Sequence, residues 1–516
     1  MTPRSIDRRR FLRIGGALSV LGAGTPFALQ LAAAGAASAA TASDYKAIVC
    51  VFMFGGNDGA NMVLATDDDS WGRYFATRNT GFSPIALMPS GIAPTPVGQR
   101  SQVTGRTALV GTPESWGGVL PITPSTPQPI PSGTNASART FGLHPFLAPV
   151  KSIFDQGRLA VVANIGALTQ PIVKSQYASN SPLLPGSLFS HNDQQSTWQS
   201  GLIEGAHVGW GGAMADVLLG MNTTNTVFTA ISPAGGALFL AGNTVKQYVV
   251  NPSQQPATVV TATQAAPLFN SPIAASTVND LIQDTSSTSN FANDYAAVMT
   301  RSIGAAATIN NAVSQGPSTT VPMAPNYVNP FTGATQPNPL AMQLQTVAEI
   351  IAAAPSLGLR RQVFFVNLGS FDTHDSQNSR QSDLLGQLAQ GLAYFDSTLA
   401  NIGGADLRSS VTTFTTSEFG RTFTSNGDGT DHAWGSHHFV MGGAVKGGNI
   451  YGQYPTLGVD QGSFYNPDMV GSILIPTTSV YQYGATLGTW FGVGPSDLAT
   501  IFPNLSNFAS PTLGFL

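Results

Sequence analysis

Runs of apolar, β-branched and aromatic residues recur along the chain, separated by segments in which apolar residues return at helical spacing. The strand-like runs cover residues 45–54, 159–165, 363–368 and 411–416, and the expected helices cover about 144–154, 291–313, 340–354, 382–402 and 483–491. Continuous apolar runs are typical of strands that are buried on both faces of a parallel sheet. This order predicts an α/β fold with a mostly parallel central sheet and helices on both faces.

Polar residues of metal-ligand type follow the predicted strands. Asp372 and His374 come after the run at 363–368, Glu418 ends the next run, and His432 and His437 precede a last apolar segment. In an open parallel sheet the ligand crevice lies beyond the carboxyl ends of the strands. Imidazoles and carboxylates in that place suit zinc or manganese, with calcium or magnesium as alternatives. The pattern predicts the site of a metallohydrolase.

Further candidates lie elsewhere in the chain. Asp58 follows the first strand in a glycine-rich turn and is a candidate metal ligand, although it is also suited to shaping that turn. Ser190 is a candidate nucleophile, with His191 beside it as a proton-transfer group. The alternative for this pair is a helix N-cap, because serine caps helices well. Arg421 is either an anion clamp or the salt-bridge partner of Glu418.

The histidines are unevenly distributed. Three of the seven in the chain fall within residues 432–438, which favours a site over scattered structural roles. The pair Asp372 and His374, taken alone, also suits a helix cap. His144 and His207 are expected to be structural.

Composition excludes several functions. Charged residues make up 9% of the 516 residues and the net charge is −4, so the basic surface that nucleic-acid binding requires is missing. The single cysteine, Cys50, excludes an intramolecular disulfide and a cysteine-rich metal cluster. Solubility must depend on uncharged polar residues, as is common in exported proteins.

The N-terminus has the features of an export signal. Arg8 and Arg9 precede an apolar stretch from Ile14 to about Ala34, and small residues suitable for cleavage follow at 37–42. The pattern is typical of the twin-arginine class, which makes the export machinery a partner and the location periplasmic or secreted. An uncleaved anchor is the alternative, but Pro26 breaks the apolar stretch. We expect a signal at 1–42, a mature domain at 43–516 and no stable membrane span after cleavage.

Residues 222–338 are rich in Thr, Ser, Asn, Gln and Ala, with strand-like runs at 227–231 and 237–240. We interpret this segment as an insertion or cap on the main sheet. Its end, from Pro317, has the composition of a linker. No internal repeat is evident.

Several short motifs resemble a bacterial exported family known only as domain of unknown function 1501. The matching stretches are 54–59, Ser190-His191 with 193–195, 369–374, 417–422, and 431–434 followed by 443–448, and the last three in that order are specific. Together with the twin-arginine signal they span nearly the whole chain.

That family is in turn similar to the alkaline phosphatase and sulfatase superfamily, an α/β fold with a two-metal site. The resemblance implies metal ligands at Asp58, Asp372 with His374, Glu418, and His432 or His437, and a nucleophile at Ser190. Two departures stand out: Glu418-Phe419 replaces the Asp-His pair of the superfamily, and the spacing from Asp372 to His374 is short. Either departure implies one metal instead of two, a different ion, or lost activity.

Three functions are therefore weighed. The first is an exported metal-dependent hydrolase of a small phosphate or sulfate ester. The second is a non-catalytic binding or surface protein that retains the fold. The third, a Ser-His-Asp hydrolase, lacks a G-x-S-x-G turn and ranks last.

Overall fold

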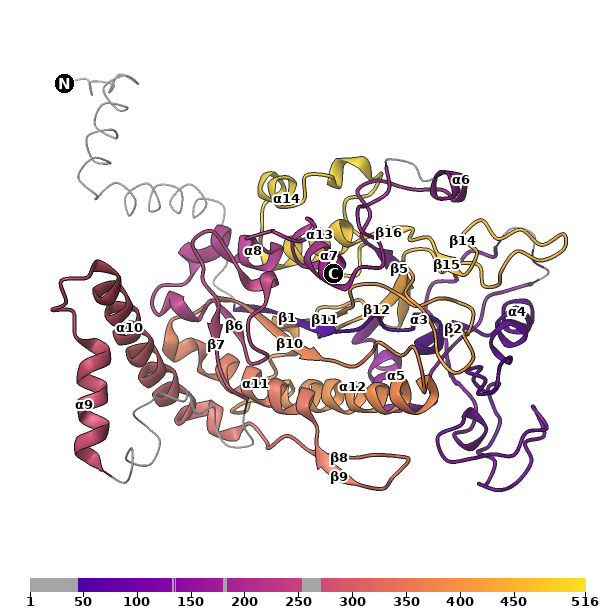
Figure 1. Cartoon of the computed structure of the whole chain (residues 1–516), viewed down its shortest axis with the longest axis horizontal. Helices are drawn as coiled ribbons and strands as arrows, with labels where there is room; N and C mark the ends of the chain where they lie inside the picture. Colours follow the sequence, from indigo (N-terminus) through magenta and orange to yellow (C-terminus); the bar gives the residue numbers. More distant parts are fainter. Residues whose placement is uncertain (1–44, 132–133, 135, 180–182, 253–270) are drawn as a thin grey trace, which may run out of the picture.

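The computed structural model describes residues 45–131, 134, 136–179, 183–252 and 271–516, so the expected signal at 1–42 lies outside the described residues. The fold is mixed α/β, with a nine-stranded central sheet and, within the described residues, twelve α-helices (Figure 1). The strands of the sheet are β1 (Lys46–Met53), β5 (Leu159–Gly166), β6 (Ala230–Ser232), β7 (Tyr248–Val249), β10 (Arg361–Leu368), β11 (Val411–Thr416), β12 (Ser436–Met441), β13 (Asn449–Tyr451) and β16 (Thr478–Ser479).

The sheet has the strand order β13-β5-β12-β11-β1-β10-β6-β7, and β16 also pairs with β5. Its pairs are parallel except for those of β12, which runs antiparallel to both β11 and β5. A parallel crossover usually contains a helix, but the segment 417–435 between β11 and β12 contains none. The expectation of a mostly parallel sheet is confirmed, with β12 as the exception.

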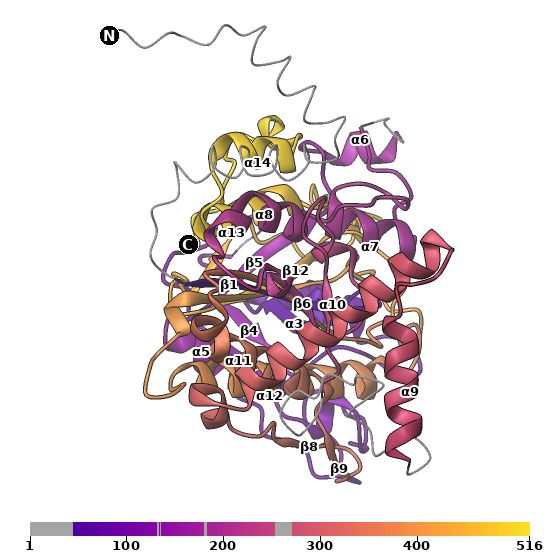
Figure 2. The ribbon, with the colours of Figure 1, turned by 90° about the vertical axis from the view of Figure 1, so that its left-hand side faces the viewer.

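The two faces of β1 enter two separate cores. Val49 and Val51 belong to one core, whereas Ile48 and Phe52 belong to the other. Apolar residues on both sides of one strand are what a sheet covered on both faces requires. Helices α5 (Ala148–Asp155), α11 (Pro339–Leu357) and α12 (Gln377–Leu399) cover the first face, and α8 (Trp210–Leu218), α13 (Val480–Phe491) and α14 (Pro495–Ile501) cover the second (Figures 1 and 2).

Helix α11 is a core helix. Among the described residues it is the one helix whose length and hydropathy meet the criteria for a membrane span, and 83% of its most apolar 18-residue window is buried. It ends at Gly358, whose left-handed φ of 72° suits the glycine C-cap of a helix.

The polar segment 222–338 contributes β6 and β7 to one edge of the central sheet. Its helices α9 (Pro272–Gln283) and α10 (Asn290–Val313) form a hairpin that extends from the end of the molecule near β6 and β7 (Figures 1 and 2). The prediction of a strand at 237–240 is wrong, because Leu238–Leu240 forms a 3-10 helix. Strands β8 (Asn326–Val328) and β9 (Thr335–Pro337) make a small hairpin within the expected linker.

The remaining elements lie outside the central sheet. The additional strands are β2 (Val63–Ala65), β3 (Leu120–Ile122) and β4 (Phe141–Leu143) in one small sheet, and β14 (Met469–Val470) with β15 (Ile473–Leu474) in another. The additional helices are α3 (Gly59–Met62), α4 (Asp68–Arg78), α6 (Lys174–Ala178) and α7 (His191–Ser200). Because β1, β5, β10 and β11 are parallel and β12 is antiparallel, the loops after the first four meet the start of β12 at one edge.

Candidate metal centre

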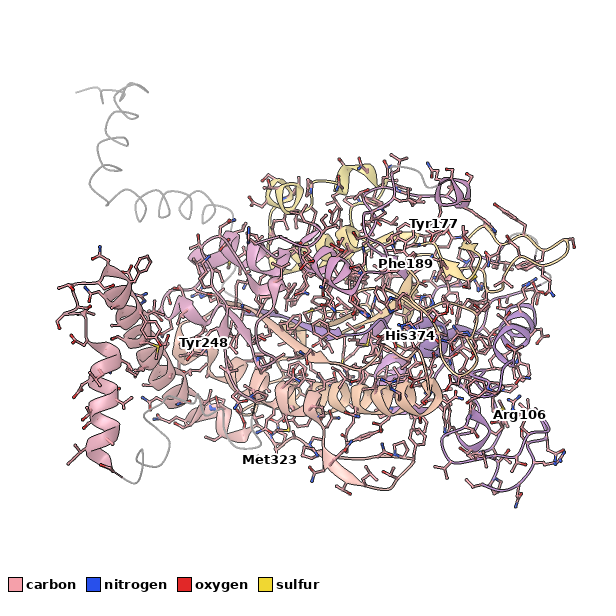
Figure 3. All side chains as sticks on the ribbon, viewed as in Figure 1. Arg106, Tyr177, Phe189, Tyr248, Met323 and His374 are labelled. Atoms are coloured by element: carbon pink, nitrogen blue, oxygen red, sulfur yellow. The ribbon has the colours of Figure 1, made fainter. Side chains whose placement is uncertain are left out.

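Three side chains from distant parts of the chain converge at this edge of the sheet. Asp372 lies in the loop after β10, His432 lies between β11 and β12, and His191 is the first residue of α7. Their ligand atoms lie within 4.8 Å of one another, so this half-buried triad could hold a metal ion. His374, which is labelled in Figure 3, lies two residues after Asp372, and its side chain is more exposed than those of the triad.

Asp372 is at the centre of the cluster. Its Oδ1 lies 3.1 Å from His374 Nε2 and 3.3 Å from His432 Nε2, and its Oδ2 lies 3.5 Å from His191 Nε2. A carboxylate is thus surrounded by the same nitrogen of three imidazoles. We refer to His191, Asp372, His374 and His432 as the four-residue cluster.

The other ring nitrogen of each histidine faces an oxygen that can only accept a hydrogen bond. His191 Nδ1 lies 2.9 Å from Glu418 Oε1, His374 Nδ1 lies 3.0 Å from Asp431 Oδ1, and His432 Nδ1 lies 2.8 Å from the Phe189 carbonyl. Each Nδ1 therefore donates, and in the neutral ring Nε2 keeps its lone pair. Carboxylate and carbonyl partners of this kind orient metal-binding histidines in many proteins.

The contact between His374 and His432 requires either a cation between the two rings or a proton on one of them. Their Nε2 atoms lie 3.0 Å apart, and with both Nδ1 atoms donating, neither neutral ring has a proton to place between them. Zinc–nitrogen bonds of about 2.0–2.1 Å in tetrahedral geometry set ligand atoms roughly 3.3 Å apart. Four separations within the four-residue cluster, those of Asp372 from the three Nε2 atoms and that between His374 and His432, are 3.0–3.5 Å and fall close to that value.

Arg421 keeps Asp372 ionised. Burial raises the pKa of Asp372, but the hydrogen bond and charge of Arg421, with the charges of His374 and His191, outweigh burial and lower that pKa overall. Arg421 Nη1 lies 2.7 Å from Asp372 Oδ1, and its side chain is fully buried. The other donors of Arg421 bind the Thr430 carbonyl and hydroxyl and the Gly55 carbonyl. Arg421 is thus the partner of Asp372, and Glu418 has other partners.

Glu418 lies behind His191. Its Oε1 accepts hydrogen bonds from His191 Nδ1, from Gly55 N at 2.8 Å and from Gln195 Nε2 at 3.1 Å, and its side chain is fully buried. The hydrogen bond to Glu418 raises the pKa of His191 above its ordinary value, against the effect of burial. This geometry makes Glu418 an orienting partner of His191, and an ion held at the cluster would contact His191 and not Glu418.

His432 is oriented by the carbonyl of a residue whose own backbone is strained. Phe189, which supplies the carbonyl for His432 Nδ1, has a left-handed φ of 75°, and a non-glycine residue in that region costs about 1–3 kcal/mol. Burial lowers the pKa of His432, which favours the neutral ring that a metal requires. Ser370, two residues before Asp372, has the same φ of 75°.

The carboxylate of Asp58 forms an ion pair with an arginine of the protein. The fully buried Arg78 of α4 pairs with both carboxylate oxygens of Asp58. Its remaining N–H groups bind Asn61 Oδ1, the Phe423 carbonyl and the Thr422 carbonyl, so all five donors of the guanidinium are used. The structure places Asp58 in this ion pair and outside the four-residue cluster.

His437 and His438 lie in β12 and are fully buried, away from the cluster. His437 Nδ1 accepts a hydrogen bond from Asn164 N at 3.0 Å, and its ring stacks on Tyr454. His438 packs between the rings of Trp198 and Tyr483. Burial lowers the pKa of each histidine to about 3, so both rings are neutral at ordinary pH.

Ser190 is the N-cap of α7. Its Oγ lies 3.4 Å from the Asp193 amide, and the side chain of Asp193 also bonds to this hydroxyl. This is the capping alternative that the sequence offered for Ser190. The cap fixes the start of α7 and with it the position of His191, so Ser190 acts on the cluster through the backbone.

Three contributors had little or no signal in the sequence. Asp431 was visible beside His432, but only the structure shows its bond to His374. The roles of the Phe189 carbonyl and of Arg78 depend on tertiary contacts, which cannot be predicted from the spacing of residues along the sequence.

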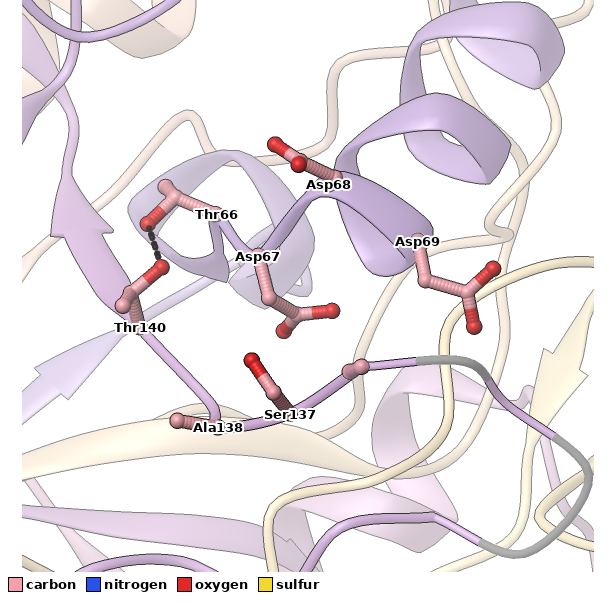
Figure 4. A pocket seen from close by; sticks show the side chains of 8 residues that line it. Thr66, Asp67, Asp68, Asp69, Ser137, Ala138 and Thr140 are labelled. Atoms are coloured by element: carbon pink, nitrogen blue, oxygen red, sulfur yellow. Dashed lines mark hydrogen bonds between the residues drawn. The ribbon is translucent and has the colours of Figure 1, made fainter.

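A polar cavity of about 580 Å³ lies at the N-terminus of α4, and its lining includes Asp67, Asp68 and Asp69 (Figure 4). Asp67 caps α4 by accepting from Ser70 N, and Asp69 pairs with Arg73. Asp67 and Asp69 therefore have local structural roles, and the three carboxylates are not among the described groups that could hold a metal ion.

The chain belongs to a family of unknown function. Residues 45–501 match the family model described as "Protein of unknown function (DUF1501)", as the motifs of the sequence predicted. No curated protein matches the chain.

Proposed function

We propose that this protein is an exported, metal-dependent hydrolase of a small phosphate or sulfate ester. One observation carries the proposal: three imidazole Nε2 atoms surround the Asp372 carboxylate, while every Nδ1 is committed to an oxygen acceptor. A site arranged in this way is already prepared for an ion before the ion binds.

The donor set favours particular metals. Three nitrogen ligands and one oxygen suit zinc or manganese, whereas calcium and magnesium prefer sites composed of oxygen ligands. Such an ion supplies Lewis acidity, lowering the pKa of a bound water and offsetting charge on an ester oxygen. We therefore place zinc or manganese ahead of calcium or magnesium.

The remaining residues support the ligands. Arg421 keeps Asp372 ionised, and Glu418, Asp431 and the Phe189 carbonyl fix the three rings. Because the Ser190 hydroxyl caps α7, we propose water as the nucleophile instead of Ser190. His191 and Arg421 then serve binding and positioning, and neither is needed for proton transfer.

A second candidate, a non-catalytic metal-binding surface protein, is favoured by the number of ligands. Four protein ligands complete a tetrahedral zinc ion, as in structural sites, whereas catalytic zinc keeps an open position. The two candidates differ in whether His374 stays bound to the ion. Its side chain is 44% exposed, so it is the ligand that a substrate would displace most easily.

Export and fold complete the proposal. The twin-arginine pattern near Arg8 and Arg9 supports transport to the periplasm or outside the cell. A mostly parallel sheet with carboxylates and imidazoles beyond its strand ends supports an alkaline phosphatase-like arrangement.

The test uses the mature protein, residues 43–516, stripped with a chelator and reloaded with zinc or manganese. Turnover of p-nitrophenyl phosphate, bis(p-nitrophenyl) phosphate and p-nitrophenyl sulfate is measured for the wild type, Asp372→Asn and the control His207→Ala, which changes an exposed histidine outside the cluster. We expect turnover only with metal, lost in Asp372→Asn and retained in His207→Ala. A protein that binds metal and turns over none of the three esters contradicts the hydrolase and supports the surface protein.

A further inference from the structure

The charges around the cluster restrict the substrate that this site accepts, an inference that rests on the proposed function. Two of the acidic residues near the cluster are already satisfied by protein groups. Asp58 is paired with Arg78, and Glu418 accepts bonds from His191, Gln195 and Gly55 N. Because Asp58 and Glu418 are bound to protein groups in this way, neither is available as a metal ligand. The described residues then provide ligands for one ion.

The loaded centre is close to neutral. Asp372, Glu418 and Asp431 contribute three negative charges, which Arg421 and a divalent ion balance. Of the lysines and arginines in the described part of the chain, Arg421 is the one that pairs with these side chains. Arg380, close by in the sequence, pairs instead with Asp375.

Arg421 is not free to bind a substrate. Its side chain has no exposed surface, and its donors are shared among Asp372, Thr430 and the Gly55 carbonyl. The cluster is backed by an apolar side chain, because the buried Phe419 ring packs against His191 at 4.9 Å and against His432 at 4.5 Å between ring centroids. A second cation that could neutralise a doubly charged ester group is missing from the contacts of the described residues.

We infer that the centre holds a single divalent ion and prefers a tetrahedral ester group with one negative charge, as in a phosphodiester or a sulfate monoester, over a dianionic phosphate monoester. Transfer of a dianionic phosphoryl group depends on several cations around its oxygens. One ion in a neutral centre backed by an apolar side chain matches one negative charge.

The test is a binding titration that does not depend on turnover. The protein is loaded with cobalt(II), and its visible absorption is followed while three non-hydrolysable probes are added at alkaline pH. Phenylphosphonate is a dianion there, whereas its monomethyl ester and benzenesulfonate are monoanions. The two monoanions distinguish the phosphodiester source from the sulfate source.

We expect one cobalt ion per chain, and we expect at least one monoanion to bind about tenfold more tightly than phenylphosphonate, a difference of about 1.4 kcal/mol. Two ions per chain, equal or tighter binding of the dianion, or no spectral response to any probe would each overturn the inference. A protein that binds the monoanions but turns over no ester contradicts the proposed function alone.

A matched pair of variants tests the charge argument. Asp431→Asn removes a negative charge that contacts His374, and it should shift the preference toward phenylphosphonate by several-fold. Asp375→Asn removes a similarly exposed charge that pairs with Arg380 outside the cluster, and it should leave the preference unchanged. An identical preference in Asp431→Asn and the wild type would overturn the charge argument.

Discussion

The Nε2 atoms of His374 and His432 face each other at 3.0 Å. Both rings donate from Nδ1 to oxygen acceptors, which leaves two lone pairs in contact unless a cation lies between them or one ring is protonated. The loop after β10 and the loop between β11 and β12 thus bring together two groups that repel each other when both are neutral. A divalent ion between the two rings would instead accept a lone pair from each.

Replacing Glu418 with glutamine should weaken metal binding by about 10- to 100-fold, because an orienting carboxylate of this kind fixes the ring and raises its basicity. The ligands themselves remain, so the cobalt(II) spectrum should keep its shape. Metal affinity is measured by competition with a chelator, and Asp375→Asn serves as the control because Asp375 pairs with Arg380. Unchanged affinity in Glu418→Gln would show that the bond to His191 has no orienting role.

Replacing Arg78 with methionine should destabilise the fold by about 3–5 kcal/mol, since it leaves the Asp58 carboxylate buried without its partner. The double variant Arg78→Met/Asp58→Asn should recover part of that loss, because the uncompensated charge is gone. Urea unfolding of both variants and of Asp58→Asn gives the coupling between the two residues. A loss below about 1 kcal/mol, the usual value of an exposed ion pair, would contradict the assignment.

The stability of the metal-free protein should decrease as the pH falls from about 6.5 toward about 3. His144, His437 and His438 are fully buried, and burial lowers the pKa of each to about 3. The unfolded chain binds these protons near pH 6.5 and the folded chain does not, so their stabilising effect is complete above that pH and is lost below it. Each histidine contributes a slope of about 1.4 kcal/mol per pH unit in this window.

The measurement is the free energy of unfolding in urea as a function of pH. His438→Leu should reduce the slope between pH 6 and 4 (~1.4 kcal/mol per unit for one group), whereas the exposed His207→Gln should leave it unchanged. Equal slopes in wild type and His438→Leu would show that His438 is protonated in the folded protein.

Gly55→Ala should impair both folding and metal binding. A Cβ at Gly55 would lie 2.2 Å from the Asp372 amide nitrogen, and Gly55 has a φ of +119°. The control is Gly98→Ala, at a φ of +88° with open space around it, which has the cost of positive φ without the clash. We expect Gly98→Ala to cost about 1 kcal/mol and to keep its metal, and we expect Gly55→Ala to lose more stability and affinity. Similar results for the two variants would contradict the close packing of β1 against the Asp372 loop.

The strands and helices of the core were largely predictable, because their apolar periodicity reflects burial on a sheet covered on both faces. The run at 363–368, for example, lies within β10, and Glu418 lies two residues after the end of β11. The antiparallel direction of β12 was not predictable, because it depends on the connection at 417–435 closing without a helix. The family was predictable from its motifs.

The site was predictable in its location and only partly in its roles. The sequence brought His191, Asp372, His374 and His432 under consideration, but which atoms face an ion depends on three long-range hydrogen bonds. Asp58 and Ser190 have residue types suited to the site, and the structure gives them an ion pair and a helix cap instead. His437 follows His432 closely in sequence, yet its position in β12 buries it against Tyr454.

Metal analysis of the mature protein, purified without chelator and also after reloading with zinc or manganese, shows whether the four-residue cluster holds an ion. The wild type is compared with Asp372→Asn, His432→Ala and the control His207→Ala by elemental analysis after gel filtration. We expect about one ion per chain in the wild type and the control, as for a single mononuclear site, and little in the two cluster variants. A wild type that stays metal-free after reloading, or cluster variants that hold as much metal as the wild type, would contradict a metal centre at the four-residue cluster.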